Sequence, residues 1–407
     1  MTILKPKFIM LCDENFTILQ DKAVAFDDKI IKIGEASELK KEFKNAEFIE
    51  EKEAILAPAF INPHVHLEFS ANKTSLVYGD FLEWLSSVIN SRSTLSQQAN
   101  EEVIKSAIKT MQKSGVGTIG AVSSFGTDLK ACVNSSARVI YFNEILGSNE
   151  EFLDVNWQGF KKRFDESVKF KSEFFTPAIS VHSPYSTHPN LAKAAINLAK
   201  EQNLLVSTHL MESDHEREWL KSGVGGFKEW LGKFSKFPKP LYSVDSFIEL
   251  FKDVRTLFTH CVYMSDFSKF DNSIHSVTHC AFSNRLLSKK TLNLQNLLDQ
   301  NISFNIGTDG LSSNISLNFL DELRANLLIH SDFDLKNLAK ILLLASTSWC
   351  AKSLNLNLGE IKEGKLADMA LYDRFGNTEQ DGLALMFLLH AKECKKLYIQ
   401  GKPLNLD

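Results

Sequence analysis

The stretch AILAPAFINPHVH, residues 54–66, decides the fold and holds the first candidate site residues. Its apolar run over residues 55–62 predicts a buried strand. His64 and His66 follow this run one residue apart, and in a strand the residues i and i+2 point to the same face. Both imidazoles would therefore aim at one point. Such a pair is weak by itself, but its place after a strand matters because catalytic residues gather at the ends of barrel strands.

Beyond Pro58, short β-type runs alternate with stretches of helical spacing such as residues 101–114 and 189–202. This alternation is typical of βα units around a parallel sheet. The predicted fold is therefore an α/β (β/α)8 TIM-type barrel, although an open doubly wound sheet would alternate in the same way. The predicted strands are residues 55–62, 117–122, 139–144, 178–182, 204–209, 256–260, 276–281 and 302–307.

The two ends of the chain have a different texture. Residues 7–34 contain short β-type runs separated by acidic and amide residues, as in the hairpins of a small antiparallel sheet. Similar runs return at residues 367–373 and 395–404. We therefore expect residues 1–57 and 356–407 to fold together into one β domain beside a barrel domain of residues 58–355.

The composition excludes several kinds of partner. The formal charge of −4 gives no electrostatic footprint for nucleic acid or an anionic membrane surface, so a small-molecule partner is expected. The six cysteines are scattered without a CxxC pair, and no stretch approaches the ~18 apolar residues of a membrane span. We expect a cytoplasmic protein with reduced thiols, and a homodimer because twofold assemblies are frequent.

Further histidines and carboxylates follow later predicted strands. His209 lies in LLVSTHL, and Glu212 follows it by three residues. His260 ends TLFTH, and Asp309 ends ISFNIGTD. A buried aspartate after an apolar strand is costly unless it is paired or bound to a metal. Separate strand ends would thus bring histidines and carboxylates to one edge of the barrel.

The predicted metal ligands are His64, His66, His209 and Asp309. Three imidazoles and a carboxylate with a free position suit a single divalent transition metal, with water as the remaining ligand. Zn²⁺ is the expected ion and Fe²⁺ the alternative. Such an ion lowers the pKa of its bound water from about 15.7 towards ~7, which makes hydroxide available at neutral pH.

Three side chains are expected to act on this water. His260 would orient or deprotonate it, Asp309 would accept its proton, and Glu212 would carry a proton to the leaving group or a ring nitrogen. Ser313 and Asn314, in the polar loop after Asp309, are expected to hold its carboxylate. These groups suit hydrolytic attack on an sp2 carbon.

At this point the chain resembles the amidohydrolase superfamily, and within it the cytosine deaminase/chlorohydrolase-like branch of mononuclear aromatic deaminases. The resemblance covers about residues 58–373 and rests on the segments PAFINPHVH, SPYSTHPNL, STHLMES, FTHCV, GTDGLSSNISLNFLDELR and GEIKEGKLADMALYD. It implies a β-sandwich formed by both chain ends and the same four metal ligands. It also implies that Glu212 is the proton shuttle and that His260 polarises the water.

The resemblance bears on the substrate side of the site as well. Branches with two metals use a carboxylated lysine at the end of the fourth strand, whereas AISVHSPYS has His182 and no lysine there, so one metal is expected. In deaminases of adenosine-like nucleosides a histidine at this position faces the substrate, which makes His182 a candidate contact. Trp84 is a candidate pocket residue, or equally a core residue of its helix. Glu68 is a further candidate substrate contact, or a paired residue at the barrel mouth.

Within this branch the chain is similar to the subfamily of aminodeoxyfutalosine deaminases, through HVHLEFSANK, YGDFLEWLSSV, SPYSTH, AFSNRLLS and DGLSSNISLNFLDELRA. This resemblance implies hydrolytic deamination of 6-amino-6-deoxyfutalosine to futalosine and ammonia, on the futalosine route to menaquinone. Adenosine, methylthioadenosine, S-adenosylhomocysteine, guanine or a chlorinated triazine are alternative substrates. A non-catalytic barrel is a remote alternative, against which the complete ligand set argues.

Overall fold

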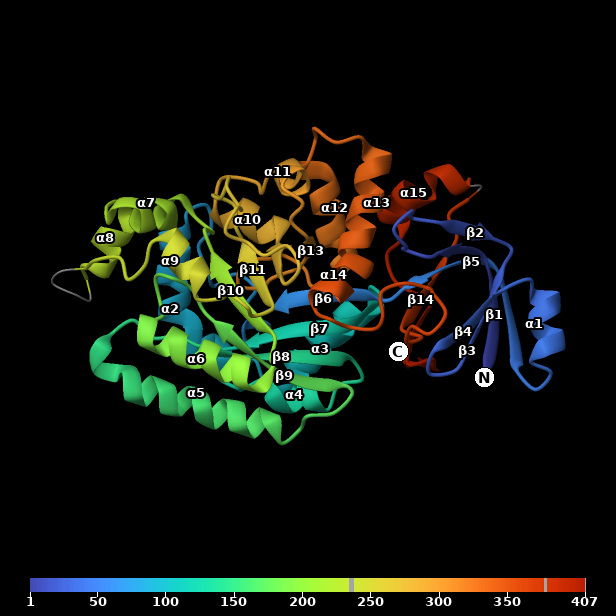
Figure 1. Cartoon of the computed structure of the whole chain (residues 1–407), viewed down its shortest axis with the longest axis horizontal. Helices are drawn as coiled ribbons and strands as arrows, with labels where there is room; N and C mark the ends of the chain where they lie inside the picture. Colours follow the sequence, from blue (N-terminus) through green and yellow to red (C-terminus); the bar gives the residue numbers. More distant parts are fainter. Residues whose placement is uncertain (234–237, 377–378, 407) are drawn as a thin grey trace.

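Eight parallel strands form the centre of the computed structural model, which describes residues 1–233, 238–376 and 379–406 (Figure 1). Each strand pairs with the next along the chain, in the order β6 to β13. The strands are β6 (Phe60–Val65), β7 (Val116–Ser123), β8 (Arg138–Ile145), β9 (Phe175–Val181), β10 (Val206–Leu210), β11 (Thr256–His260), β12 (His275–His279) and β13 (Phe304–Ile306). All eight predicted strand positions are therefore occupied by strands.

The first and last strands meet and close the barrel. The backbone N–H of Asp309, just after β13, donates to the carbonyl of His64 in β6 at 3.1 Å. The side chain of Asn62 adds two bonds to Thr308, accepting from its backbone N–H at 3.1 Å and donating to its hydroxyl at 2.8 Å. The predicted TIM-type barrel is thus confirmed, and the open doubly wound sheet is wrong.

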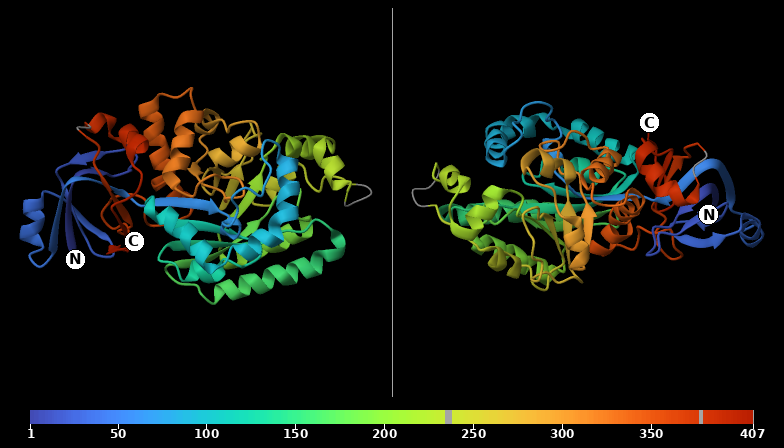
Figure 2. Two further views of the ribbon diagram at one scale, coloured as in Figure 1. Left: turned by 180° about the vertical axis from the view of Figure 1, so that it is seen from behind. Right: turned by 90° about the horizontal axis from the view of Figure 1, so that it is seen from above.

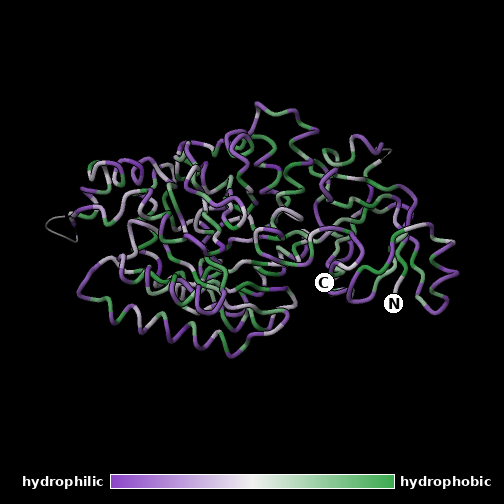
Figure 3. The backbone as a smooth tube through the Cα atoms, viewed as in Figure 1, coloured by the Kyte–Doolittle hydropathy of each residue, from purple (hydrophilic) through white to green (hydrophobic). Residues whose placement is uncertain are grey.

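Helices surround the barrel on its outside, as the views from behind and from above show (Figure 2). The tube coloured by hydropathy shows why, because apolar residues follow the strands while the outer helices carry polar residues (Figure 3). The helices are α2 (Phe81–Gln98), α3 (Glu101–Lys113), α4 (Leu129–Val133), α5 (Leu153–Val168), α6 (Pro189–Gln202), α7 (Asp214–Ser222), α8 (Gly226–Leu231), α9 (Val244–Glu249), α10 (Ala281–Leu287), α11 (Leu294–Asp299), α12 (Phe319–Ile329), α13 (Leu335–Ala345) and α14 (Ser348–Ser353).

Both ends of the chain form a second, mixed sheet beside the barrel (Figure 1). Its strands are β1 (Thr2–Met10), β2 (Ile18–Gln20), β3 (Ala23–Phe26), β4 (Ile30–Gly34), β5 (Glu47–Pro58), β14 (Met369–Asp373), β15 (Lys396–Ile399) and β16 (Lys402–Pro403). β5 pairs in parallel with β1 and antiparallel with β14, which joins the two ends into one sheet. The sheet is therefore mixed rather than purely antiparallel, and helix α1 (Ala36–Glu42) packs on it.

The two parts of the molecule are connected in several places. The run predicted as one strand at residues 55–62 is divided between β5 of the β domain and β6 of the barrel. Helix α15 (Leu383–His390), in the C-terminal segment, packs against α12 and α13 of the barrel. The domain limits 1–57 with 356–407 and 58–355 stay a prediction.

Two further expectations concern membranes and thiols. Among the described residues, no helix is long and apolar enough to cross a membrane. All six cysteines are buried and unpaired.

Candidate active site

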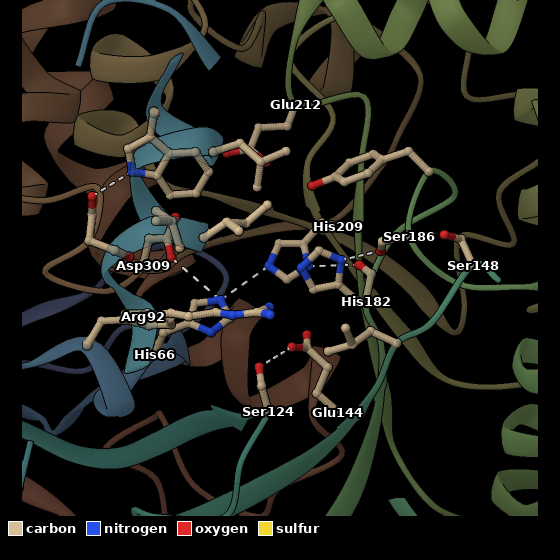
Figure 4. Close-up of a pocket in the computed structure, with 18 of the residues that line it drawn as sticks. His66, Arg92, Ser124, Glu144, Ser148, His182, Ser186, His209, Glu212 and Asp309 are labelled. Atoms are coloured by element: carbon tan, nitrogen blue, oxygen red, sulfur yellow. Dashed lines mark hydrogen bonds and ion pairs between the residues drawn. The ribbon is translucent and has the colours of Figure 1, made fainter. Parts of the chain in front are cut away.

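A cavity opens at the carboxyl ends of the barrel strands, and most of the predicted site residues line it (Figure 4). The lining includes His66, Trp84, His182, His209, Glu212, His260 and Asp309. His64 is not part of the lining, but its side chain lies beside that of Asp309 and is 1% exposed. Residues far apart in the sequence therefore meet where catalytic residues of barrels gather.

The four predicted metal ligands converge. The Nε2 atoms of His64 and His66 lie 3.8 and 3.7 Å from Oδ1 of Asp309. Nε2 of His66 is 3.3 Å from Nε2 of His209. The buried Nε2 of His64 has no hydrogen-bond partner among the described residues, and buried polar atoms without a partner are rare. This donor set fits one divalent transition metal.

Contacts at the Nδ1 atoms of His209 and His64 fix the orientation of these two imidazoles. Nδ1 of His209 lies 2.8 Å from the backbone oxygen of His182, which can only accept a hydrogen bond. The proton is therefore on Nδ1, and Nε2 keeps its lone pair for a ligand. Nδ1 of His64 lies 3.3 Å from the hydroxyl of Thr259, so its Nε2 is also the nitrogen that faces Asp309.

The carboxylate of Asp309 is held by three donors. The hydroxyls of Ser283 and Ser313 each donate to Oδ2 at 2.8 Å, and the backbone N–H of Gly310 donates to Oδ1 at 2.8 Å. Burial raises the pKa of Asp309, but His66 and the other neighbouring histidines, together with Ser283, outweigh it and hold the pKa below its ordinary value. Asp309 also has a positive φ of 58°, a conformation that non-glycine residues rarely adopt outside constrained sites.

The loop after Asp309 was predicted to hold this carboxylate through two residues. Ser313 does so, as described above. Asn314 does not, because its amide donates to the carbonyl of Thr308 at 2.7 Å and to Glu322 at 2.9 Å. Asn314 therefore supports the backbone of the loop rather than the carboxylate.

His260 and Glu212 lie on the other side of Asp309. Nε2 of His260 is 3.5 Å from Oε1 of Glu212 and 4.0 Å from Oδ2 of Asp309. Burial lowers the pKa of His260, although Asp309 and Asn284 oppose this. Burial, the charge of Asp309 and that of Glu216 raise the pKa of Glu212 well above its usual range. The two shifts favour the neutral imidazole and the protonated carboxyl, the forms that suit proton transfer.

Sequence reasoning missed the residue that orients His260. Oδ1 of Asn284, in α10, lies 2.8 Å from Nδ1 of His260 and accepts its proton in a hydrogen bond. The amide nitrogen of Asn284 lies 3.0 Å from Nδ1 of His279, and Nε2 of His279 lies 3.1 Å from Nε2 of His330. A buried polar chain thus fixes which nitrogen of His260 faces the cavity. The sequence feature that could have pointed to Asn284 is the polar segment FSN directly after the strand predicted at residues 276–281.

The three candidate substrate contacts have different surroundings. His182 lines the cavity, and its Nδ1 lies 3.1 Å from the hydroxyl of Ser183. Trp84 also lines the cavity, with its indole N–H donating to the carbonyl of Ser312 at 2.8 Å. Glu68 does not line it, which corrects the expectation of a direct substrate contact.

Glu68 instead organises a loop of the cavity wall. Its carboxylate is 1% exposed and accepts hydrogen bonds from the backbone N–H groups of Ser124, Phe125 and Thr127. These bonds occupy the lone pairs with which the Glu68 carboxylate would otherwise accept a hydrogen bond from a substrate hydroxyl. Ser124 and Phe125 themselves line the cavity, so Glu68 acts on the site through this loop.

Glu144, which the sequence reasoning did not name, does line the cavity. It lies near the end of β8, is 1% exposed, and accepts hydrogen bonds from the hydroxyls of Ser124 and Ser180. One of its oxygens lies within 4.8 Å of ring nitrogens of His182 and His209. A carboxylate at the end of an apolar strand was the available signal, as it was for Asp309.

Comparison with known proteins shows to which family this chain belongs. Its sequence matches the model of the amidohydrolase family over residues 55–404. The chain belongs to the amidohydrolase family. It is 42% identical to the aminodeoxyfutalosine deaminase of a Nitratiruptor species, with 99% of each chain covered. It is 38% identical to the adenosine deaminase of Helicobacter pylori, with 98% of each covered.

A solved amidohydrolase has nearly the same structure. The crystal structure of Helicobacter pylori aminofutalosine deaminase in complex with methylthio-coformycin matches with a TM-score of 0.93 and 37% identity, over 100% of both chains. An adenosine deaminase from Xanthomonas campestris with bound zinc matches with a TM-score of 0.79 and 18% identity, over 99% of this chain and 92% of its own, and shares the fold. This chain is accordingly a hydrolytic aminohydrolase of a metal-dependent family, and the non-catalytic alternative is wrong.

Proposed function

We propose that this aminohydrolase deaminates 6-amino-6-deoxyfutalosine to futalosine and ammonia, on the futalosine route to menaquinone. The observation that carries the proposal is the 42% identity to an aminodeoxyfutalosine deaminase over 99% of both chains. The close match to the aminofutalosine deaminase that binds methylthio-coformycin supports it.

Adenosine is the second candidate substrate. The relative with 38% identity is named an adenosine deaminase, and it covers the chain almost as completely. Because both substrates carry the same 6-aminopurine, the groups around His260 and Glu212 would serve either of them. The choice between them therefore depends on the cavity wall that faces the rest of the nucleoside.

The proposed mechanism uses the groups at the strand ends. His64, His66, His209 and Asp309 would hold the metal, which supplies a nucleophile by lowering the pKa of water. Nε2 of His260 lies 4.0 Å from Oδ2 of Asp309 and both residues line the cavity, so a water between them would be within reach of two groups that can take its proton.

Glu212 would supply the proton that the purine needs. Burial raises the pKa of Glu212 and so favours its protonated carboxyl, which can protonate a ring nitrogen as the hydroxyl group adds at C6. The resulting Glu212 carboxylate can then take the proton of the C6 hydroxyl and pass it to the amino group, which leaves as ammonia while the carbonyl forms; the proton held by His260 or Asp309 afterwards returns to Glu212. The net reaction consumes one water and converts a C–NH₂ group into a carbonyl.

The variant Glu212→Gln tests this role. The amide keeps the shape of the side chain but cannot deliver a proton, so we expect kcat to fall by about 10²–10⁴-fold while bound metal is retained. Turnover is measured by ammonia release and metal content by mass spectrometry. Unchanged kcat in a protein with full metal content would contradict the shuttle role.

The substrate is tested by ammonia release from aminodeoxyfutalosine, adenosine, methylthioadenosine, S-adenosylhomocysteine and guanine. We expect kcat/KM to be highest for aminodeoxyfutalosine, by about a hundredfold, which corresponds to roughly 2.7 kcal/mol of transition-state discrimination. A higher kcat/KM for another nucleoside would leave the deaminase activity in place but would overturn the assignment to the futalosine route.

The finer points of metal and assembly are proposals too. We propose one Zn²⁺ per chain, with Fe²⁺ as the alternative, because both ions accept three imidazoles and a carboxylate. Metal analysis of the purified enzyme, followed by chelation and reloading with each ion, distinguishes them. We also keep a cytoplasmic location and a homodimer as predictions, and light scattering that shows a monomer would overturn the second.

A further inference from the structure

The hydrogen bonds that begin at His260 continue away from the cavity through two further histidines. Nδ1 of His260 bonds to Oδ1 of Asn284 at 2.8 Å, and the amide nitrogen of Asn284 bonds to Nδ1 of His279 at 3.0 Å. Nε2 of His279 then lies 3.1 Å from Nε2 of His330, the residue that follows α12. All four residues are buried, and we call them the histidine chain.

The histidine chain can carry its hydrogen bonds in two opposite directions. A neutral imidazole donates from one nitrogen and accepts at the other, and an amide donates from its nitrogen and accepts at its oxygen. In the observed direction His260 donates to Asn284, whose amide group donates to Nδ1 of His279. His279 must then carry its proton on Nε2 and donate it to His330. In the reverse direction all four groups exchange donor and acceptor together, and the proton of His260 moves to Nε2.

The direction matters because Nε2 is the nitrogen of His260 on the side of the cavity. It lies 3.5 Å from Oε1 of Glu212 and 4.0 Å from Oδ2 of Asp309. In the observed direction this nitrogen has a free lone pair and can take the proton of an attacking water, whereas in the reverse direction it already carries a proton. The residue that decides the direction therefore decides whether His260 can act as a base.

His330 holds the outer end of the histidine chain. Within the described residues, it is the one hydrogen-bond partner of Nε2 of His279. Burial lowers the pKa of His330 from 6.5 to about 4, so the ring is neutral at neutral pH and keeps one nitrogen without a proton. A buried N–H group without an acceptor is costly, so this nitrogen stabilises the form of His279 that carries its proton on Nε2.

The backbone keeps the two outer rings in contact. His279 is the last residue of β12, and the backbone N–H of Ala281, two residues later, donates to the carboxylate of Glu322 in α12. The backbone N–H of His330 donates to the carbonyl of Asn326 in the same helix at 3.4 Å. Because α12 is thus fixed to the end of β12, what can change between the two rings is the nitrogen that carries the proton.

We propose that His330 is a remote positioning residue of the active site, which keeps the proton of His260 on Nδ1 by accepting the proton of His279. The inference rests on the proposed function in one respect, since it assumes that His260 takes a proton from the attacking water. It extends the groups that control the reaction to His279 and His330, neither of which lines the cavity.

The test changes what position 330 offers to His279. His330→Phe keeps a flat ring without nitrogens, and His330→Lys offers donors only. His330→Gln has an amide oxygen that can accept the proton of His279. The matched control is His390→Phe, at an exposed histidine that ends α15. For each protein we measure melting temperature, zinc content, and kcat and KM with aminodeoxyfutalosine and adenosine.

The position of the proton on His260 is measured separately by 15N NMR of the zinc-loaded protein labelled at histidine. Protonated and unprotonated ring nitrogens differ in 15N chemical shift, so the spectrum shows which nitrogen of His260 carries the proton. The signals of His260 are assigned by their loss in His260→Gln. This readout does not depend on turnover.

We expect His330→Phe and His330→Lys to shift the proton of His260 towards Nε2. Their kcat should fall by about 10–100-fold with little change in KM and with full zinc content. His330→Gln should retain most of the activity and the shifts of wild type, and His390→Phe all of both. Unchanged 15N shifts of His260 in His330→Phe and His330→Lys would overturn the inference even if kcat fell, and so would equal shifts in His330→Gln and His330→Phe.

The outcomes separate this inference from the proposed function. If the proton of His260 moves to Nε2 in His330→Phe and kcat does not change, the histidine chain is correct and the proposed role of His260 fails. If none of the proteins deaminates either nucleoside, the proposed function fails, and the 15N shifts of His260 still decide the role of His330.

Discussion

At the residue scale, the hydrogen bond between His260 and Asn284 determines how the imidazole can work. Oδ1 of Asn284 accepts a hydrogen bond from Nδ1–H of His260 at 2.8 Å, so the unprotonated Nε2 faces Glu212 and Asp309. His279 in turn holds the amide of Asn284, so the amide cannot flip without losing a bond. Groups that orient a site histidine in this way commonly affect activity by about 10–100-fold.

We therefore expect Asn284→Ala to lower kcat by about 10–100-fold while the metal content stays complete. Asn284→Asp keeps an acceptor oxygen towards Nδ1 of His260 and should restore much of the activity. Steady-state kinetics and metal analysis of both variants provide the measurement. Equal activity of the alanine and aspartate variants would show that the orientation of His260 does not depend on Asn284.

Glu216 gives the molecule a dependence of stability on pH. Burial raises its pKa from 4.5 in the unfolded chain to about 7, although the backbone N–H groups of Met211, Glu212 and Ser213 oppose this. The folded state then binds the proton more tightly. The contribution of Glu216 to stability is complete below pH 4.5 and is lost as the pH rises to about 7.

The variant Glu216→Gln should remove this dependence. Its amide oxygen can accept from the backbone N–H of Glu212, and its NH₂ group takes the place of Oε1, which has no partner in the described structure. Relative to wild type, the variant should gain up to about 3 kcal/mol between pH 4.5 and pH 8. Melting temperatures of both proteins across this range check the sign, and a difference that does not change with pH would contradict it.

The site residues that could be predicted from the sequence are those that directly follow predicted strands. His64, His66, His209, His260, Glu212 and Asp309 all follow apolar strands, and the structure brings them together. Glu68 was misjudged because its partners are backbone N–H groups of a loop 56 or more residues away, which no local pattern reveals. Asn284 was missed because its role depends on the distance to His260 rather than on its residue type.

At the scale of elements, Gly120 shows how closely β6 and β7 approach below the metal ligands. A Cβ atom at Gly120 would lie 2.0 Å from the carbonyl oxygen of Pro63, the residue before His64. No real pair of atoms tolerates this distance, and the obstacle is backbone rather than a flexible side chain. Gly120 is therefore required for the register in which β6 presents His64.

We expect Gly120→Ala to push Pro63 away, with a loss of about 1–3 kcal/mol or more of stability and weaker metal binding through His64. Gly34→Ala, at the end of β4, is the matched control because a Cβ there meets nothing within 4 Å. Melting temperature and metal content are compared for both variants. Normal metal content in Gly120→Ala would show that β6 can shift without moving His64.

The elements themselves were predictable where a buried strand is bounded by polar turns. The predicted strand at residues 256–260 coincides with β11, and the helix expected at 189–202 coincides with α6. The run 55–62 was not resolved into β5 and β6, because its residues are buried on both sides of the point near Ala59 where the chain crosses from one sheet to the other. Periodicity cannot show which neighbour a fully buried strand pairs with.

At the scale of the whole molecule, a buried ion pair joins the barrel to the β domain. Arg138 at the start of β8 lies 3.2 Å from Oδ2 of Asp368, the residue before β14, and their side chains are 7% and 1% exposed. Oδ1 of Asp368 accepts from the backbone N–H of Gln400 at 2.8 Å. The sequence predicted that both chain ends form one β domain, but the contacts with the barrel depend on single residues and could not be predicted.

A double-mutant cycle at this pair measures how strongly the two parts are coupled. Asp368→Leu alone leaves the Arg138 guanidinium buried without its carboxylate, which typically costs about 3–5 kcal/mol. The double variant Arg138→Met/Asp368→Leu replaces both charges by apolar groups of similar size and should recover most of this loss. If instead the double variant melts as low as the sum of the single variants, Arg138 and Asp368 act independently, and the packing of α15 on α12 and α13 becomes the main connection.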